Sequence, residues 1–444
     1  MTAPSQIRPG LADIVDRLVD PRVGVVASVS EVHRDPGAPD FFHYGALAAN
    51  TGPLTGRNNF RSTGGAAATR QDAVAKAVGE AVERYCSAWY ELDQLPLTSA
   101  ASAGFPCVAP EEFALYDPAQ FAWPDFAPEP FTEDTVVRWT PMTDFHTGRR
   151  VHVPAARVYM PYFFYTGSGD APICQPISTG LACHGGWSRA ALAAVCEVVE
   201  RDAITIAWQA MLSPPQIMIE TLPDELYDLV ARFERAAAEV TLFDLTLDHG
   251  VPVVLAALRS RHSGGPALVV AGSAAVDAHT AVRKALEELA HTRRYSQLIY
   301  TRLPRLRPDP PLHRTVTGQR EHLNFWADHA NLPLADFLFA GKQRSDFEDL
   351  PDLGTGDAAG DLDTVCARVA AAGERVLLAD LTTPDVGELG LSVVRAVVPG
   401  MHPLQLGHGL RALGGHRLRT VPQTLGHPGL DPAAGDNPAP HPYP

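Results

Sequence analysis

The stretch 188–210 constrains the fold of this chain more than any other segment. It has the length of a long helix, and only five of the 19 residues from Ala190 to Trp208 are polar. A helix that is this apolar is buried nearly all round. Four of its polar residues are clustered: Glu197, Glu200, Arg201 and Asp202. Because a buried charge without a partner is costly, this cluster needs partners inside the protein.

Two other segments are built in the same way, with small residues followed by a predicted helix that carries acidic residues. The helix predicted over 70–91 contains Glu80, Glu83 and Arg84, and the helix over 278–298 contains Glu287 and Glu288. A side-chain oxygen just before a helix can accept the free N–H groups of its first turn. The predicted N-caps of the three helices are therefore Thr69, Ser188 and Asp277.

The spacing of the glutamates indicates two kinds of site. Glu residues at positions i and i+3 share one helix face, and they repel each other unless a cation lies between them. Two such helices would present four carboxylates, which are the hard oxygen ligands that Mg²⁺ takes. Arg84 and Arg201 each follow the first Glu of a pair by four residues and could bind phosphate oxygens. A buried Glu–Arg network without a metal is an equally good interpretation of the pattern.

The rest of the chain alternates between predicted helices and strands, which indicates a mixed α/β architecture. Residues 31–60 and those beyond about 400 are expected to be loop-rich. The other predicted helices cover 11–19, 223–237, 317–329 and 359–372. The predicted strands cover 22–30, 135–140, 151–160, 239–245, 252–259, 267–273, 375–381 and 391–398.

Composition excludes several classes of protein. With 36 Lys and Arg against 51 Asp and Glu, the formal charge is −15, which argues against nucleic-acid or anionic-membrane binding. The six cysteines form no CxxC pair, so neither a disulfide framework nor a structural zinc module is expected. No run is apolar enough for a membrane span, and the N-terminus lacks a signal-peptide pattern. We therefore expect a soluble cytoplasmic protein.

Gly64-Gly65 is not followed by GK[ST], so no P-loop is predicted.

Taken together, these segments resemble the YcaO family of ATP-dependent enzymes that modify peptide backbones. The resemblance extends in family order from about residue 20 to residue 444, and the proline-rich end resembles the azoline-forming branch, the cyclodehydratases of thiazole/oxazole-modified peptide biosynthesis. The matching stretches are DPRVGVVASV, AVGEAVERYC, PISTGLACHGG, AVCEVVERDA, ALEELAHTRRY, VVRAVVPGMHPL and NPAPHPYP.

The resemblance implies that ATP and Mg²⁺ bind through the paired glutamates, Glu80 with Glu83 and Glu197 with Glu200. Arg84 and Arg201 match the arginines of these two motifs. The third helix implies further nucleotide contacts from Glu288, His291 and Arg293. The implied reaction adds a Cys, Ser or Thr side chain of a precursor peptide to the preceding amide carbonyl. Phosphorylation of the amide oxygen by ATP and loss of phosphate then leave a thiazoline or oxazoline.

This chain departs from the family pattern at three positions near the nucleotide. A Gly-Lys-Gly turn of the family reads Gly65-Ala66-Ala67 here, so a phosphate-binding lysine is missing. Arg61 and Lys76 are candidates to replace it. Lys76 stands where the family has a hydroxyl residue, and His291 stands where it has glutamine.

The C-terminal tail allows two interpretations. Pro438 to Pro444 includes four prolines, and Pro440, Pro442 and Pro444 alternate with other residues. Such a terminus is commonly a flexible linker or a polyproline ligand. Its stiffness would also let it enter a cleft at low entropic cost. By resemblance we favour the second interpretation, with the Pro444 carboxylate as the base that accepts the proton of the attacking side chain.

We expect three parts: an N-terminal segment 1–20, a catalytic domain 21–435 and the tail 436–444. Nothing before residue 20 is long enough for a leader-peptide-binding domain, so a separate E1-like (ThiF-like) partner protein is expected, as is a homodimer. Two alternatives to cyclodehydration stay open. One is thioamide or amidine formation by the same fold, and the other is a non-catalytic scaffold that binds a peptide or a partner.

Overall fold

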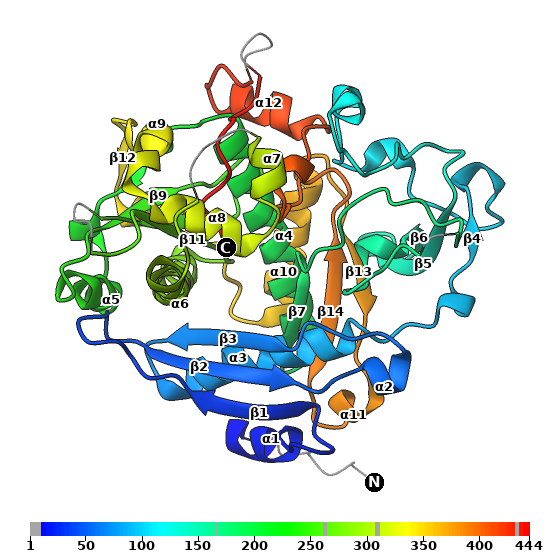
Figure 1. The fold of residues 1–444 in the computed structure, drawn as a ribbon, viewed down its shortest axis with the longest axis horizontal. Helices are drawn as coiled ribbons and strands as arrows, with labels where there is room; N and C mark the ends of the chain where they lie inside the picture. Colours follow the sequence, from blue (N-terminus) through cyan, green and yellow to red (C-terminus); the bar gives the residue numbers. More distant parts are fainter. Residues whose placement is uncertain (1–9, 166, 261–263, 307–310, 431–434) are drawn as a thin grey trace.

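Three β-sheets organise the part of the chain described by this computed structural model, namely residues 10–165, 167–260, 264–306, 311–430 and 435–444. The first sheet is antiparallel in the order β1-β2-β3 and lies along the lower edge of Figure 1. The helix α3 packs on β2 and β3, and the short α1 lies beside the sheet. The bounds are Leu11–Leu18 for α1, Val26–Glu31 for β1, Phe42–Ala48 for β2, Ser62–Ala67 for β3 and Arg70–Cys86 for α3.

The second sheet has the order β11-β10-β9-β8-β12, and the long helix α6 packs against β11 and β10. Helices α5 and α8 pack against α6. Helices α7 and α9 lie in the same part of the molecule as the second sheet (Figure 1). The strands are β8 (Gln216–Ile217), β9 (Val240–Asp244), β10 (Val253–Arg259), β11 (Leu268–Ala274) and β12 (Arg344–Ser345). The helices are α5 (Asp224–Glu234), α6 (Ala278–Arg302), α7 (Leu312–Thr315), α8 (Gln319–Ala327) and α9 (Asp336–Phe339).

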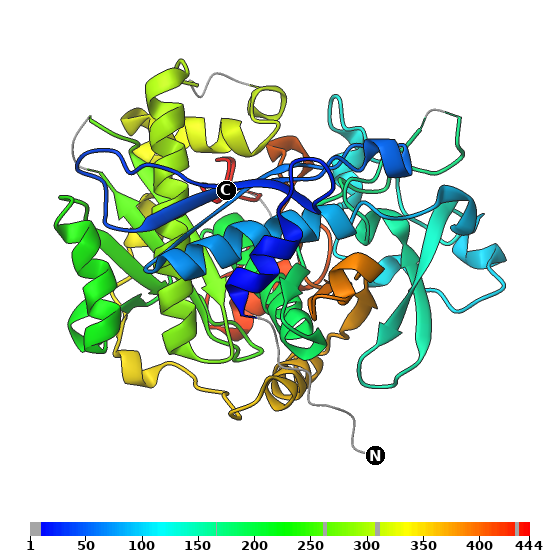
Figure 2. The same ribbon diagram turned by 90° about the horizontal axis from the view of Figure 1, so that it is seen from below.

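The third sheet has the order β4-β5-β13-β14-β7, with β6 paired to β5. Its outer strands belong to the lobe at the right of Figures 1 and 2. The strands are β4 (Leu97–Thr98), β5 (Val137–Asp144), β6 (Arg150–Pro154), β7 (Leu181–His184), β13 (Leu377–Asp380) and β14 (Ser392–Val397). The remaining helices are α2 (Gly52–Thr55), α4 (Trp187–Gln209), α10 (Ala358–Ala371), α11 (Pro384–Gly387) and α12 (Arg417–Thr424).

The helix α4 lies at the centre of the molecule, as its apolar composition predicts. It packs on β14 and β7 of the third sheet, on β11 and β10 of the second, and on α10 and α12. Every residue from Ala203 to Gln209 is buried. With both sheets and two helices around it, α4 has no broad face left for solvent, so its charged side chains must meet partners from other elements.

The helices α3, α4 and α6, which we call the motif helices, share one local design: each follows a strand after a short turn, in the pairs β3–α3, β7–α4 and β11–α6. The predicted caps Thr69 and Asp277 are confirmed, since their side chains accept hydrogen bonds from Asp72 N and Thr280 N. The prediction of Ser188 as the third cap is wrong. The helix begins one residue earlier, and the cap position is Gly186, whose φ of 103° lets the chain turn directly into the helix.

Two segments predicted as loop contain regular structure. The strand β2 falls inside 31–60, where pairing with both β1 and β3 stabilises it in spite of its Gly45. The helix α12 falls in the Gly-, His- and Pro-rich region beyond 400, and ion pairs of the fully buried Arg417 hold its first turn in place. Among the described residues, no helix is long and apolar enough to cross a membrane.

Candidate active site

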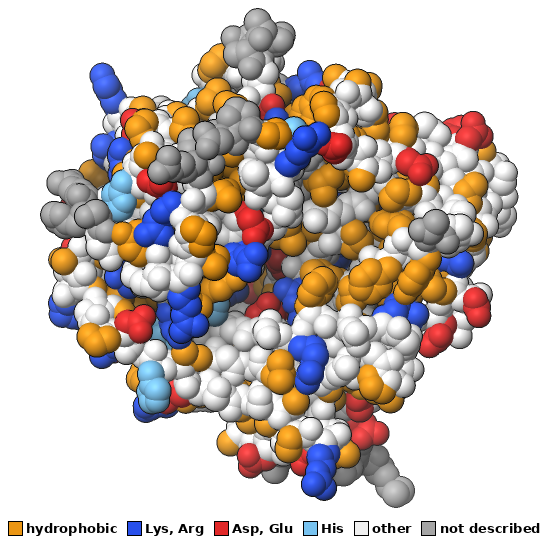
Figure 3. Space-filling view, viewed as in Figure 1, with side chains coloured by type: hydrophobic (Ala, Val, Ile, Leu, Met, Phe, Trp, Pro, Cys, Tyr) orange, Lys and Arg blue, Asp and Glu red, His pale blue; other side chains and the backbone are white. Residues whose placement is uncertain are grey.

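The charged side chains of the motif helices contact one another and the neighbouring strands, and the face shown in Figure 3 has a hollow at its centre. Acidic and basic side chains gather in this hollow, and hydrophobic side chains border it. Contacts between the helices confirm the convergence. Lys76 of α3 lies 2.9 Å from Glu287 of α6, and the backbone N–H of Cys183, just before α4, donates to Glu83 of α3 over 2.9 Å.

The first glutamate pair lies on α3 and has separate partners for its two members. Glu80 forms an ion pair with Arg84 at 3.0 Å and accepts a hydrogen bond from the backbone N–H of Gly64. Glu83 is held by the Cys183 N–H. The motif therefore places one carboxylate toward β3 and the other toward β7, the strand that leads into α4.

The second pair lies on α4 and shares one arginine. Arg201 lies 3.3 Å from Glu197 Oε1 and 3.1 Å from Glu200 Oε1. Glu200 also accepts hydrogen bonds from the backbone N–H of Ala274 at 3.2 Å and from the Tyr443 hydroxyl at 2.6 Å. The C-terminal tail thus reaches one of the glutamates singled out by the sequence.

Two of these carboxylates are short of positive charge. Burial raises the pKa of Glu83 well above its usual range, and the negative charges of Glu80 and Glu197 add to the rise, against Arg84 and the Cys183 N–H. Burial also raises the pKa of Glu200, although Arg201 and the Tyr443 hydroxyl oppose it. Glu80, Glu83 and Glu197 therefore repel one another across the two helices, and an added cation would relieve that repulsion.

Asp202 does not belong to this group, although it follows Arg201 directly. Its fully buried carboxylate faces the other side of α4, where it accepts from the His402 N–H at 2.8 Å and pairs with Arg417 at 2.9 Å. Its role is to attach the C-terminal region to the central helix.

The third motif helix, α6, contributes its side chains at the edge of the first sheet. Lys76 lies 3.5 Å from Glu288. His291 packs so closely on Gly64 that a Cβ there would lie 2.7 Å from His291 Cε1. His291 Nδ1 is buried and has no hydrogen-bond partner among the described residues. Arg293 is partly buried. Burial lowers the pKa of its guanidinium, and the negative charge of Asp35 opposes this.

The two proposed substitutes for the missing lysine are both engaged by other groups. Lys76 lies between Glu287 and Glu288. The Arg61 Nε donates to the backbone carbonyl of Ala48 over 2.9 Å. Their roles as phosphate ligands stay predictions.

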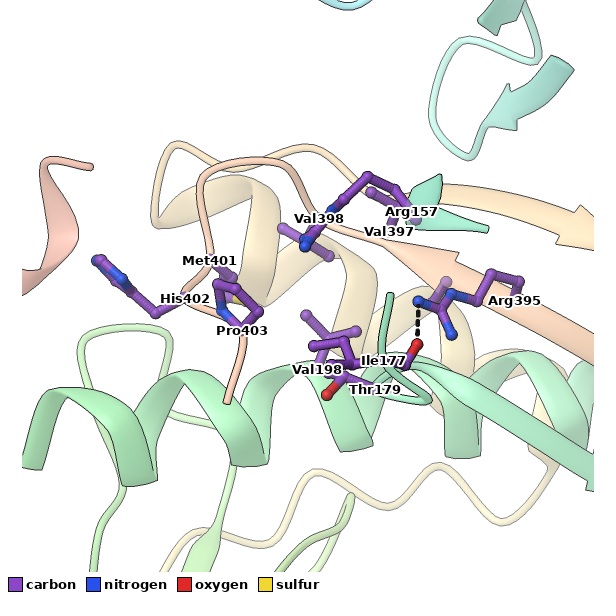
Figure 4. Close-up of a pocket in the computed structure, with 11 residues that line it drawn as sticks. Arg157, Ile177, Thr179, Val198, Arg395, Val397, Val398, Met401, His402 and Pro403 are labelled. Atoms are coloured by element: carbon purple, nitrogen blue, oxygen red, sulfur yellow. Dashed lines mark hydrogen bonds between the residues drawn. The ribbon is translucent and has the colours of Figure 1, made fainter. Parts of the chain in front are cut away.

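Two buried arginines near the site were missed by reasoning from the sequence. Arg395 of β14 and Arg157 line one small cavity (Figure 4). Its walls also include Val198 of α4 and Thr179, which precedes β7. Arg395 Nη2 donates to the Ile177 carbonyl over 3.0 Å, but its Nε and Nη1 have no hydrogen-bond partner among the described residues. The sequence feature that could have revealed Arg395 is its position as a lone arginine inside the apolar strand VVRAVV.

The charge on Arg395 is poorly compensated. Burial, with the like charge of Arg157, lowers the pKa of its guanidinium to about 9, and Glu197 opposes this only in part. Buried N–H groups without acceptors are rare in folded proteins and call for an explanation. An anionic ligand beside Glu197 would supply the missing acceptors.

The C-terminal tail is buried and anchored, so the interpretation as a flexible linker is wrong for its described residues 435–444. The indole N–H groups of Trp208 and Trp326 donate to the carbonyls of Ala439 and Pro440 at 2.9 and 2.8 Å. From Ala439 to Tyr443 every residue is buried, and Pro444 is partly buried. The ring of Tyr443 lies under the Arg201 guanidinium, 4.5 Å from it.

The arrangement suits a cation held jointly by carboxylates and a phosphate. Among the described residues, no three acidic, His or Cys side chains converge closely enough to enclose a metal ion by themselves. Mg²⁺ is commonly bound by one or two carboxylates together with substrate phosphates and waters, and it needs no complete protein cage. The Nε and Nη1 groups of Arg395, which have no hydrogen-bond partner among the described residues, fit the phosphate side of such a site.

Comparisons with known proteins show the family and the fold of this chain. A family model described as "YcaO cyclodehydratase, ATP-ad Mg2+-binding" matches residues 64–402. An uncharacterised protein from Methanothermobacter thermautotrophicus is 28% identical over 346 residues, covering 76% of this chain and 80% of that protein.

Solved structures share the fold. A heterocyclase in complex with substrate and cofactor matches 98% of this chain with a TM-score of 0.78 at 22% identity. YcaO from Methanopyrus kandleri, bound with AMPPCP and Mg²⁺, matches 88% of this chain and 90% of its own, with a TM-score of 0.61 at 23% identity. The heterocyclase TruD matches 82% of this chain with a TM-score of 0.65. This chain spans 57% of the length of the first heterocyclase and 50% of TruD.

Proposed function

Because this chain belongs to the YcaO family, we propose that it is an ATP-dependent peptide cyclodehydratase. Its substrates would be Cys, Ser or Thr residues of a ribosomal precursor peptide, converted to thiazolines or oxazolines. The observation that carries the proposal is the burial of the proline-rich tail, whose Tyr443 touches Glu200.

The residues fit Mg²⁺ and ATP in two groups. Glu80, Glu83, Glu197 and Glu200 offer hard oxygens for the metal. Glu83 and Glu200 are buried, and the charge of Glu197 acts against both of them, so a cation would stabilise the ionised group. Arg84, Arg201 and Arg395 offer N–H groups to phosphate oxygens. When bound, Mg·ATP supplies the phosphoryl group that turns a poor leaving group, the amide oxygen, into a good one.

The tail would supply the base. The Tyr443 hydroxyl binds Glu200, and Pro444 is the next residue of the chain. Its terminal carboxylate is proposed to accept the proton from the attacking thiol or hydroxyl. A base works only within hydrogen-bond reach of the proton that it removes, so the anchoring of the tail by Trp208 and Trp326 has a direct chemical purpose.

The proposed partners are a precursor peptide and a separate E1-like protein that holds its leader, with a homodimer of this chain as the working assembly and the cytoplasm as its location. A complex of several chains, the E. coli microcin synthetase McbBCD with a bound pro-peptide, has a matching fold at a TM-score of 0.55. That structure supports the proposal of partner chains.

Mass spectrometry tests the proposal. Purified protein, ATP, Mg²⁺, a candidate precursor and the E1-like partner are combined, and the peptide is weighed. We expect the loss of one water for each ring, with one phosphate released. A gain of mass from sulfur replacing oxygen would indicate thioamide formation instead. An unchanged peptide with every candidate partner would favour the scaffold alternative. The absence of the Gly-Lys-Gly lysine is the sequence feature that supports this alternative.

A further inference from the structure

Glu200 is crowded on both of its carboxylate oxygens. The Tyr443 hydroxyl donates to Oε1 over 2.6 Å, Arg201 Nη1 lies 3.1 Å from the same oxygen, and the Ala274 N–H takes Oε2 at 3.2 Å. The side chain is 10% exposed. A cation that is to bind Oε1 must therefore approach an oxygen that a tail residue already holds by a short hydrogen bond to a charged group, which is among the stronger kinds.

The Tyr443 hydroxyl has a second acceptor within reach. The backbone carbonyl of Gly272 lies 3.4 Å from the hydroxyl, too far for a strong bond but reachable by a small shift of the ring. Gly272 lies directly against the ring: a Cβ on it would be in ordinary contact with Tyr443 Cε2 at 3.5 Å, and its close contact, at 2.9 Å, would be with Ile204 Cδ1. The hydroxyl can thus leave Glu200 and still be satisfied in a buried place.

The packing around the tip of the tail also permits movement. An apolar cavity borders Pro442 and Tyr443, and its walls include Ile204, Trp208 and Phe337. The tail is fixed just before this point, because Trp326 holds the Pro440 carbonyl and His441 Nε2 lies 2.9 Å from the Gln405 carbonyl. His441 Nδ1 also lies 3.1 Å from the Tyr443 carbonyl, so the parts that can shift are the Tyr443 side chain and the terminal Pro444.

We propose that Tyr443 is a positioning residue that couples loading of the metal site to the placement of the C-terminal carboxylate. Without a cation its hydroxyl binds Glu200. When a cation takes Glu200 Oε1, the hydroxyl transfers its hydrogen bond to the Gly272 carbonyl, and Pro444 moves with it. This inference rests on the proposed function, and it adds that the tail competes with the metal for one oxygen.

The first test measures binding without turnover. Isothermal titration calorimetry with Mg·AMPPCP compares the wild type with Tyr443→Phe. Because the variant removes the competitor, it should bind about three- to tenfold more tightly. Tyr90→Phe is the matched control: it removes a buried hydroxyl that donates to the Pro161 carbonyl and has no part in the tail, so its affinity should equal that of the wild type. The same Tyr443→Phe protein should form rings more slowly at saturating ATP, so that kcat falls while KM for ATP also falls.

Equal or weaker binding by Tyr443→Phe would overturn the inference. No binding by the wild type would instead overturn the proposed nucleotide site, so the two failures are distinct. A second measurement uses the wild-type chain labelled with 3-fluorotyrosine, with the Tyr443 signal assigned by its absence in Tyr443→Phe. Its ¹⁹F resonance should shift on titration with Mg·AMPPCP, with the same midpoint as the calorimetric isotherm. A resonance that stays in place while the nucleotide binds would also overturn the inference.

Discussion

Lys76 Nζ lies 2.9 Å from Glu287 Oε2, and this ion pair joins the first and third motif helices. The Glu287 side chain is 1% exposed, and its other partners are Arg283 at 3.2 Å and the Ala68 N–H at 3.2 Å. At the position of Lys76 the family resemblance leads one to expect a hydroxyl residue. The lysine therefore has a structural partner in this chain that the family pattern does not suggest.

Removal of this lysine should destabilise the protein. In Lys76→Met the buried Glu287 keeps Arg283 but loses its closest cation, so we expect the free energy of unfolding to fall by about 1–3 kcal/mol, less than for a fully unpaired charge. Urea denaturation measures this. Lys76→Arg, which can keep the ion pair, is the control. A loss below about 0.5 kcal/mol, the range of ordinary surface substitutions, would show that the pair contributes little.

The ion pair between Asp202 and Arg417 should matter more for stability than for chemistry. Asp202→Asn leaves a fully buried guanidinium with one carboxylate, Asp248, and we expect a loss of about 3–5 kcal/mol. Asp248→Asn is the control, with a loss of about 1 kcal/mol, because its side chain is 24% exposed. Equal losses in the two variants would contradict this ranking. Mg·AMPPCP affinity should be unchanged in any Asp202→Asn protein that stays folded.

Arg395 should be a residue whose removal harms binding more than folding. Its guanidinium lacks acceptors for Nε and Nη1, so Arg395→Met removes a poorly compensated charge along with one hydrogen bond to Ile177. We expect thermal stability within about 1 kcal/mol of the wild type, compared with about 2–5 kcal/mol for an ordinary large truncation in a core. Mg·AMPPCP affinity should fall at least about tenfold, the worth of one charge-assisted hydrogen bond. Unchanged affinity would remove Arg395 from the phosphate side of the site.

Buried histidines should make the protein sensitive to acid. Burial lowers the pKa of His43, His249, His402 and His441 to about 4 and that of His408 to about 3. Two of them accept hydrogen bonds from backbone N–H groups, which only a neutral ring can do: His249 from Val251 and His402 from Leu418.

These five histidines therefore take up more protons in the unfolded chain than in the folded one between pH 6.5 and about 4. The buried Glu83 and Glu200, whose pKa values are raised, act in the opposite direction, and the histidines outnumber them. The free energy of unfolding is full above pH 6.5 and should fall as the pH decreases through this window. Urea titrations from pH 7.5 to 5 at constant ionic strength measure the slope. His402→Gln should show a smaller slope than the wild type. A stability that is flat from pH 7.5 to 5 would contradict the burial of these rings in the neutral form.

Much of the candidate site could be predicted from local patterns. The three motif helices, the caps Thr69 and Asp277, and the burial of α4 all follow from periodicity and side-chain chemistry within a few residues. The strand β2 and the helix α12 could not be predicted in this way. Each depends on partners far away in the chain, namely the flanking strands for β2 and the Arg417 ion pairs for α12.

The sequence by itself determined which side chains are acidic, which helices carry them, and that the chain ends in a stiff proline tail. Only the tertiary structure decided their partners. Asp202 turns away from Glu200 to Arg417, Lys76 bridges to Glu287, and Tyr443 closes on Glu200 across 243 positions of the chain. The physical reason is that helix formation is governed by neighbours within about one turn, whereas the partner of a buried charge is chosen by whichever distant elements pack against its helix.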